Sequence, residues 1–194
     1  MQLVFASGNK NKIQELGQLI GKDIDLLGLE DIGCRTEIPE TSPTIEGNAL
    51  QKAWYIVNHY QRNCFADDTG LEIDALEGRP GVLSARYAGE SKDAGNNMDK
   101  VLGELAGQNN RRARFRTVIA LILDGKALTF EGVMEGEILQ NKRGIHGFGY
   151  DPIFQPSGFN RSFAEMTLVE KNKLSHRAIA VHKLVDYLKG LISQ

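Results

Sequence analysis

Apolar positions near the start of the chain change from a continuous run to a helical spacing. Residues 3–6 form a short apolar run, which is typical of a fully buried strand. Beyond a polar stretch at residues 7–12, apolar side chains recur at helical spacing at Ile13, Leu16, Leu19 and Ile20. The pattern predicts a strand, a polar turn and a helix, followed by a second short strand at residues 24–27.

A second helix is predicted between an irregular loop and the next strand. Two prolines interrupt residues 38–43, and this loop carries Glu40. Thr44 has the position of an N-cap for a helix that runs to about Tyr60. Its apolar face consists of Ala49, Ala53, Trp54, Ile56 and Val57. Residues 64–66 then return as a strand.

The clearest β signal is a long hairpin in the second half of the chain. Residues 115–123 and 127–139 flank Asp124-Gly125, and this dipeptide supplies the positive φ angles that a tight hairpin turn needs. The pattern therefore predicts a two-stranded ribbon that is long compared with most strands.

Two further helices complete the predicted elements. Ser91 is expected to cap a helix with apolar positions at Met98, Val101, Leu102 and Leu105. Ser175 is expected to cap a C-terminal helix with apolar positions at Ile179, Leu184, Val185 and Leu188. The order of elements favours an α/β fold: a mixed central sheet flanked by helices, with a long β-hairpin region and a cleft between two lobes.

Composition narrows the class of protein. The 194 residues are enough for one ordinary domain, so we expect a single domain over residues 1–194. The 23 basic and 25 acidic side chains give a net charge of −2, which argues against a duplex-binding protein and so against a nucleic-acid partner. No run is long enough for a membrane span, and the N-terminus does not read as a signal peptide. Cys34 and Cys64 lack metal or redox spacing, so a soluble cytoplasmic protein with buried cysteines is expected.

The strand at residues 64–66 leads into Asp67-Asp68-Thr69-Gly70. Neighbouring side chains on a strand point to opposite faces, so the two carboxylates can share a site only if the strand ends at or before them. Gly70 favours such an ending; otherwise one aspartate works and the other is structural. Carboxylate oxygens suit Mg²⁺, which usually completes its shell with water and substrate phosphate. The alternative is a solvated turn with no chemistry.

The polar stretch between the first strand and helix is a candidate phosphate site. A helix N-terminus offers free backbone N–H groups and a positive dipole end. Further donors come from the residues of the turn, which are Ser7, Gly8, Asn9, Lys10, Asn11 and Lys12. Lys12 is the strongest candidate among them. The stretch matches neither common phosphate-binding glycine motif, so an ordinary turn with surface lysines remains the alternative.

Polar residues gather on two other elements. Glu46, Asn48 and Lys52 lie on or near one face of the second helix, where a solvated face is the simpler explanation. Three arginines at positions 112, 114 and 116 would share one strand face. A nucleic-acid patch is conceivable there, but the lack of an aromatic series favours a solvated or subunit-facing edge.

A glycine- and aromatic-rich loop is a candidate site for a planar ligand. Residues 144–154 combine glycines with aromatic faces and an acid, and Phe148 could stack on a base. The alternative is core and turn. Further along, His176 and Arg177 would occupy a first helical turn, where cations are unfavourable. Two of them there suggest a function that offsets the cost.

Six motifs occur in order along the chain. They are Ser7-Gly8-Asn9 with Lys12, Glu46-Asn48-Ala49 with Lys52, residues 66–71, Pro80-Gly81 with residues 84–87, residues 148–152, and Ser175-His176-Arg177. Together they resemble the Ham1-like inosine triphosphate pyrophosphatase family. The resemblance spans nearly the whole chain. It implies hydrolysis of ITP, dITP and XTP to the monophosphate and pyrophosphate, with Mg²⁺, by a homodimeric α/β protein with a cleft between its lobes.

The resemblance also implies roles for individual residues. Asp68 would be the general base and a metal ligand, and Glu40 a second metal ligand for which Glu46 is a rival. The phosphates would bind residues 7–12. The remaining substrate contacts would be Thr69, Phe148, Gly149, Tyr150, Asp151, Lys171, His176 and Arg177. Thr69 stands where many members have serine, which keeps the hydroxyl.

The implied chemistry agrees with the residue types. Asp68 would orient or deprotonate a water for attack at the α-phosphorus, with lysines and metal neutralising phosphate charge. Hydrogen-bond donors at His176 and Arg177 would favour a purine with an oxygen at position 6. The sequence does not indicate which residue would exclude guanine. A non-catalytic nucleotide or RNA sensor, or a pyrophosphatase with another base preference, remain the alternatives.

Overall fold

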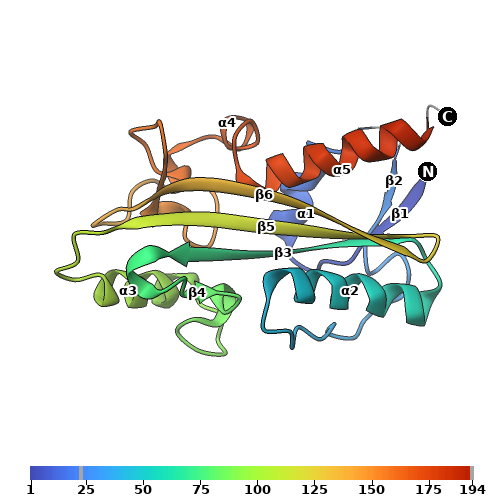
Figure 1. The fold of residues 1–194 in the computed structure, drawn as a ribbon, viewed down its shortest axis with the longest axis horizontal. Coiled ribbons are helices and arrows are strands. Elements are labelled where there is room, and N and C mark those ends of the chain that lie inside the picture. The colour runs from blue at the N-terminus through green and yellow to red at the C-terminus, as the bar shows by residue number, and fades with distance from the viewer. Residues whose placement is uncertain (22–23, 193–194) are drawn as a thin grey trace. The chain divides into compact units, whose positions relative to one another are not determined.

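The computed structural model describes residues 1–21 and 24–192 and contains a mixed seven-stranded sheet (Figure 1). The strands are β1 (Gln2–Phe5), β2 (Asp25–Leu27), β3 (Cys64–Ile73), β4 (Pro80–Gly81), β5 (Arg112–Leu123), β6 (Lys126–Ile138) and β7 (Phe154–Pro156). The order is β2-β1-β3-β5-β6-β7, and β4 pairs with β3. β1 is parallel to β2 and β3, whereas β3–β4 and β6–β7 are antiparallel. The predicted mixed sheet flanked by helices is confirmed.

The helices are α1 (Lys10–Gly17), α2 (Ile45–Tyr60), α3 (Ala94–Glu104), α4 (Leu168–Lys171) and α5 (His176–Ile192). The first four begin at polar side chains that accept from their first N–H groups. Thr44 caps α2 as predicted, by accepting from the backbone N–H of Gly47. The predicted cap of α3 at Ser91 is wrong: the Asp93 side chain accepts from the Asn96 N–H, and the helix begins after it. Among the described residues, no helix is both long and apolar enough to cross a membrane.

The chain forms two compact units. The first comprises residues 1–68, 117–132 and 177–194, and the second comprises residues 69–116 and 133–176. The structure of residues 193–194 lies outside the described range. The prediction of one domain over the whole chain stays a prediction.

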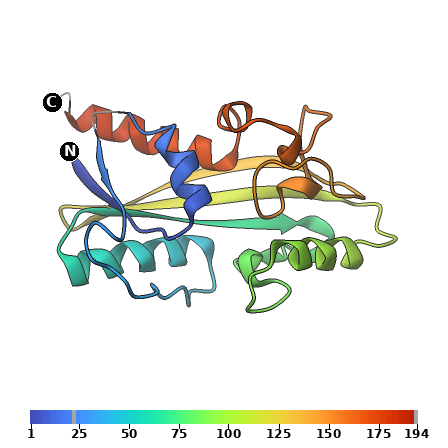
Figure 2. The ribbon, with the colours of Figure 1, turned by 180° about the vertical axis from the view of Figure 1, so that it is seen from behind.

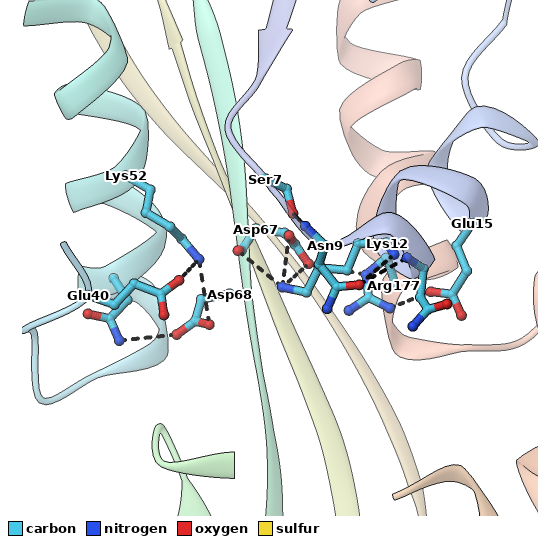
Figure 3. A network of polar contacts seen from close by, with 11 residues as sticks. Ser7, Asn9, Lys12, Glu15, Glu40, Lys52, Asp67, Asp68 and Arg177 are labelled. Carbon is cyan, nitrogen blue, oxygen red and sulfur yellow. Dashed lines mark hydrogen bonds and ion pairs between the residues drawn. The ribbon is translucent and has the colours of Figure 1, made fainter. Parts of the chain in front are cut away.

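The core of the first unit lies against both faces of its strands. On one face, α1 and α5 lie side by side (Figures 1 and 2) and contribute Leu16, Leu184 and Leu188. They pack with residues of β1, β3 and β5, among which the Phe5 and Phe65 rings stack at 5.0 Å. The opposite face carries α2 (Figure 3), which buries the apolar residues Ile45, Ala49, Ala53 and Ile56, whereas Trp54 and Val57 are half-buried. Burial on both faces explains why β1 and β3 begin as continuous apolar runs.

The second unit has an aromatic core. Phe154 lies 4.6 Å from Phe115 and 5.2 Å from Phe163 between ring centres, and aliphatic residues of β3 and α3 surround the three rings. These side chains fix the start of β5, β7 and the turn at residues 163–165 in one packed cluster. The loop of residues 144–153 is therefore attached to a rigid base.

Two strand predictions have opposite outcomes. The long hairpin is confirmed, with Asp124 and Gly125 at φ angles of 49° and 76°. The predicted ending of β3 near Asp67 and Gly70 is wrong, because the strand continues to Ile73. Pairing with β4 places Leu71 opposite Gly81 and Glu72 opposite Pro80, which holds the chain extended beyond the glycine. Cys34 and Cys64 are buried and free, as predicted.

We expect Gly136→Ala to destabilise the protein. A Cβ at this position of β6 would lie 2.3 Å from the Gln155 carbonyl oxygen and 2.6 Å from Cζ of Phe154. Overpacking of this kind costs about 1–3 kcal/mol. Gly103→Ala is the control, because a Cβ there has no heavy atom within 4 Å and alanine favours the helix. Urea unfolding should show a lower free energy of unfolding for Gly136→Ala and no decrease for Gly103→Ala. Equal decreases in the two variants would contradict the packing of Gly136 against Gln155 and Phe154.

Candidate functional site

The continuation of β3 sends Asp67 and Asp68 to opposite faces of the sheet (Figure 3). Asp67 points toward α1 and the start of α5, whereas Asp68 points toward α2. Of the two possibilities left open by the sequence, the structure therefore shows the second, in which adjacent carboxylates have separate surroundings.

Asp67 is buried between two cations. The Lys12 Nζ donates to its Oδ1 at 3.0 Å, and the Arg177 Nε donates to its Oδ2 at 3.1 Å. Arg177 also pairs through Nη1 with the carboxylate of Glu15. Asp67 and Arg177 are each only 2% exposed. The four side chains therefore form a chain of alternating charges that runs from Lys12 through Asp67 and Arg177 to Glu15.

Burial and charge in this cluster shift the pKa values of Asp67, Lys12 and Arg177. Burial raises the pKa of Asp67, but Lys12 and Arg177 outweigh it and hold that pKa well below its usual range. Burial lowers the pKa of Lys12 despite the nearby Asp67 carboxylate. Burial lowers the pKa of Arg177, but the carboxylates of Asp67 and Glu15 outweigh burial and raise that pKa above its ordinary value. Asp67 is therefore a permanent anion at neutral pH.

The turn at residues 7–12 is ordered by its own side chains. The Asn9 Oδ1 accepts from the Asn11 and Lys12 N–H groups at 3.0 and 3.3 Å, and the Ser7 Oγ accepts from the Asn9 N–H at 3.3 Å. Lys10 and Asn11 are exposed, and a Cβ at Gly8 would meet no heavy atom within 4 Å. The turn therefore leaves open space at Gly8, four residues before Lys12, the residue that the sequence singled out.

Asp68 lies in a second group of polar side chains. Its Oδ1 is 3.8 Å from the Lys52 Nζ, and its Oδ2 accepts from the Asn48 Nδ2 at 3.3 Å. Lys52 also forms an ion pair with Glu40. The structure thus joins Glu40 to Asp68 through one ammonium group, whereas Glu46, the rival acid, is exposed in the first turn of α2.

Burial and neighbouring carboxylates act together on Asp68. Burial is the largest cause and raises the pKa of Asp68, the charges of Glu40 and Asp67 add to it, and Lys52 opposes them. Burial also opposes the charge of Lys52, but Asp68 and Glu40 raise its pKa. Burial raises the pKa of Glu40, but Lys52 outweighs it and lowers that pKa. Asp68 is therefore the more basic of the two adjacent aspartates.

Glu40 and Asp68 fit a divalent metal ion as a two-carboxylate site. Both already share a cation in Lys52, and burial, which raises the pKa of Asp68, makes a further positive charge beside its carboxylate favourable. Among residues 1–21 and 24–192, no group of three or more acidic, histidine or cysteine side chains could hold a metal by itself. A hard cation bound here would therefore depend on water and phosphate oxygens for most of its shell, which is the usual arrangement for Mg²⁺.

The second unit contains a buried ion pair beneath the Phe148 loop. The Lys171 Nζ lies 2.6 Å from the Asp151 Oδ2, and the two side chains are 3% exposed. The same Oδ2 accepts from the Phe148 N–H at 2.8 Å, and Lys171 lies 4.8 Å from the Phe148 ring centre. Gly147 must be glycine, because at its φ of 73° a Cβ would lie 2.1 Å from that Oδ2.

Other predicted substrate residues of this unit have structural contacts. The Tyr150 hydroxyl donates to the Ser84 carbonyl at 2.8 Å, which ties the loop to the segment before α3. The His176 ring stacks on Phe115 at 4.5 Å between centres. Thr69 is half-buried in β3, and Gly149 has a φ of 62°. Phe148 is the partly exposed aromatic face of the loop.

The structure places one predicted residue in different surroundings and adds one that was missed. Arg177 was expected in the base pocket, but its guanidinium bonds Asp67 and Glu15 in the first unit. A base-reading role for Arg177 stays a prediction without support from these contacts. Glu15 was not singled out, although its position three residues after Lys12 places both on one face of α1.

Comparisons with known proteins agree on one family. Residues 3–187 match the model of the Ham1 family. The chain is 55% identical over 188 residues to a dITP/XTP pyrophosphatase of Flavobacterium johnsoniae, covering 97% of this chain and 98% of that protein. It is 44% identical over 193 residues to a dITP/XTP pyrophosphatase of Bacillus subtilis, with coverages of 97% and 98%. The structure of the Staphylococcus aureus Ham1 protein superposes with a TM-score of 0.90 at 36% identity, covering 98% of this chain and 99% of that one.

We expect the contribution of Asp67 to stability to disappear in acid. Its folded-state pKa lies below the ordinary value of 3.8, so the ionised form stabilises the fold at neutral pH, and protonation removes that stabilisation as the pH falls below this value. Asp67→Asn leaves buried cations without this partner and should cost about 3–5 kcal/mol at neutral pH.

The measurement is urea unfolding of wild type and Asp67→Asn at about pH 7 and about pH 3. The difference between the two proteins should be largest at the first pH and smaller at the second, because the stabilisation begins to decline below pH 3.8 and is lost completely only below the folded-state pKa. Asp186→Asn, at an exposed position of α5, is the control and should differ little from wild type. A difference of equal size at both pH values would contradict the assigned ion pairs.

Proposed function

Because this chain belongs to the Ham1 family, we propose that it hydrolyses dITP, ITP and XTP to the nucleoside monophosphate and pyrophosphate. The observation that carries the proposal is the pair of adjacent carboxylates on β3, each paired with a lysine from a different helix. Hydrolysis of a phosphoric anhydride needs charge neutralisation at the phosphates and a base for water, and these groups supply both.

Asp68 is the general base in this proposal. Its pKa is raised by burial and by the carboxylates of Glu40 and Asp67, which makes it a better proton acceptor than an exposed aspartate. Its carboxylate takes a proton from the water that attacks the α-phosphorus, a new oxygen–phosphorus bond forms, and pyrophosphate leaves. Lys52, 3.8 Å from Oδ1, limits the charge that accumulates around the two acids.

Glu40 and Asp68 are the residues that would hold Mg²⁺. When bound, the metal ion would neutralise negative charge on the phosphate oxygens and on the pyrophosphate that leaves. The contribution of the chain itself is to keep both carboxylates within reach of one cation, which the shared ion pairs with Lys52 do. The identity of the metal as Mg²⁺ belongs to the proposal.

Lys12 is assigned to the phosphates. Its ammonium group is held by Asp67, and the turn in front of α1 is open at Gly8. Exposed donors at Lys10 and Asn11 and the positive end of the α1 dipole lie at the same turn. A helix N-terminus with an adjacent lysine is a suitable site for phosphate oxygens.

Residues of the second unit are assigned to the base. Phe148 offers a ring for stacking, and Asp151 fixes its backbone through the N–H. Lys171 and His176 supply donors, and a site rich in donors accepts the oxygen at position 6 of hypoxanthine and xanthine but not the amino group of adenine. Thr69, Gly149 and Tyr150 complete the proposed contacts.

The assembly and location of the protein are part of the same proposal. A homodimer in the cytoplasm, without nucleic-acid or membrane partners, follows from the family resemblance and from the near-neutral charge of the chain. On the predicted arginine-rich strand face, Arg114 pairs with Glu72 at 2.6 Å. That pairing is in keeping with a solvated or subunit-facing edge.

We expect ITP, dITP and XTP to be hydrolysed at least about tenfold more efficiently than ATP, because adenine would leave buried donors unpaired. The test is kcat/KM for these substrates and GTP with Mg²⁺, with pyrophosphate as the detected product. Release of inorganic phosphate instead would contradict attack at the α-phosphorus. Tight binding of ITP without turnover would identify a sensor rather than an enzyme.

We expect Asp68→Asn to lower kcat by about 10²-fold or more while the protein stays folded, because the amide keeps the shape but cannot accept the proton. Glu46→Gln is the matched control, since this exposed acid of α2 has no place in the proposed chemistry. Steady-state kinetics with ITP and thermal unfolding decide the matter. A kcat above about a tenth of wild type for Asp68→Asn would remove its assignment as general base.

A further inference from the structure

The side chain of Asn48 connects Asp68 to the loop that carries Glu40. Asn48 lies in the first turn of α2 and is 1% exposed. Its Oδ1 accepts from the backbone N–H of Ser42 at 2.8 Å, and its Nδ2 donates to the Asp68 Oδ2 at 3.3 Å. One buried amide therefore contacts both a strand residue and a loop two residues beyond Glu40.

The orientation of this amide is fixed by chemistry. The Ser42 backbone nitrogen can only donate, so the atom that faces it must be the carbonyl oxygen of the amide. The amino end must then face the Asp68 carboxylate, which can only accept when ionised. No other uncharged side chain of this size offers a donor and an acceptor at the two ends of one planar group.

This contact distinguishes the two oxygens of Asp68. Oδ2 is held by Asn48, whereas Oδ1 lies on the side of Lys52, which pairs with Glu40. Rotation of the carboxylate would break the hydrogen bond from the buried amide and leave its amino group without this acceptor, which is unfavourable for a buried donor. Oδ1 is thus kept toward Glu40.

We propose that Asn48 is a positioning residue that orients the Asp68 carboxylate, so that Oδ1 is presented for proton transfer and metal binding, and that it sets the position of the Glu40 loop relative to that oxygen. The proposal rests on the hydrolytic function proposed above. Groups that support a reacting carboxylate in this way typically contribute about 10- to 100-fold to activity or metal affinity.

The chain provides a matched control on the same helix. The Gln51 side chain accepts from the Thr41 N–H at 2.9 Å and donates to the Thr41 hydroxyl at 2.9 Å. Gln51 therefore attaches the same loop to α2 through two hydrogen bonds, and neither of them involves Asp68. A comparison of Asn48 and Gln51 variants separates attachment of the loop from orientation of the carboxylate.

The experiment uses the full chain with Asn48→Asp, Asn48→Ala and Gln51→Ala. Asn48→Asp keeps the acceptor for Ser42 but loses the donor to Asp68, and both Asn48 variants should lower kcat for dITP by about tenfold or more with KM within about threefold. Calorimetric titration with Mn²⁺ alone, without nucleotide, should show about tenfold weaker binding to Asn48→Ala. Gln51→Ala should keep every value within about threefold of wild type.

The outcomes separate this proposal from the proposed function. A folded Asn48→Asp with kcat within about threefold of wild type, or a Gln51→Ala loss equal to that of Asn48→Asp, would overturn the role of Asn48. If wild type hydrolyses none of the triphosphates, the proposed function is wrong, and the Mn²⁺ titration alone tests the role of Asn48. Weaker Mn²⁺ binding by Asn48→Ala would then support the positioning role, and unchanged binding would overturn it. If Asn48→Ala does not fold, Asn48→Asp decides through kcat.

Discussion

The alternation of side chains along β3 is the constraint on which the acid site depends. A fully paired strand must send adjacent aspartates to opposite faces, so each needs its own compensation for burial. Lys12 from α1 and Lys52 from α2 supply it. Burial raises the pKa of both aspartates; two cations outweigh it at Asp67, whereas it prevails at Asp68, which shares Lys52 with Glu40. One strand thus holds two adjacent aspartates of different basicity.

In the second unit, buried charge is compensated by a single ion pair. Lys171 and Asp151 neutralise each other in the interior, and Asp151 retains a lone pair for the Phe148 N–H. The ion pair therefore shapes the backbone of the loop as well as compensating charge. Gly147 is required by this geometry, since any side chain would displace the carboxylate. One of the glycines noted in the sequence thus has its physical cause in this carboxylate.

Features that depend on neighbouring residues were predictable from the sequence, and those that depend on distant pairing were not. The cap at Thr44 and the Asp124-Gly125 turn follow from side-chain chemistry within a few residues. Gly70 suggested a strand end, but pairing with β4 is invisible locally and keeps the strand extended. The cap of α3 was misplaced by two residues because Ser91 and Asp93 are both good N-caps. The contacts of Arg177 could not be predicted, because Asp67 and Glu15 are distant from it in the sequence and only the fold brings them together.

Arg177 shows that the compensation for a cation at a helix N-terminus can come from within the protein. Cations disfavour a helix N-terminus, so its position at the start of α5 implied a compensating interaction. Asp67 and Glu15 provide that compensation within the protein. This arrangement also bears on the proposed role of Lys12: if its ammonium group binds phosphate, Asp67 keeps Arg177 as a partner and is not left as an isolated buried charge. A second cation on Asp67 therefore lowers the cost of committing Lys12 to a ligand.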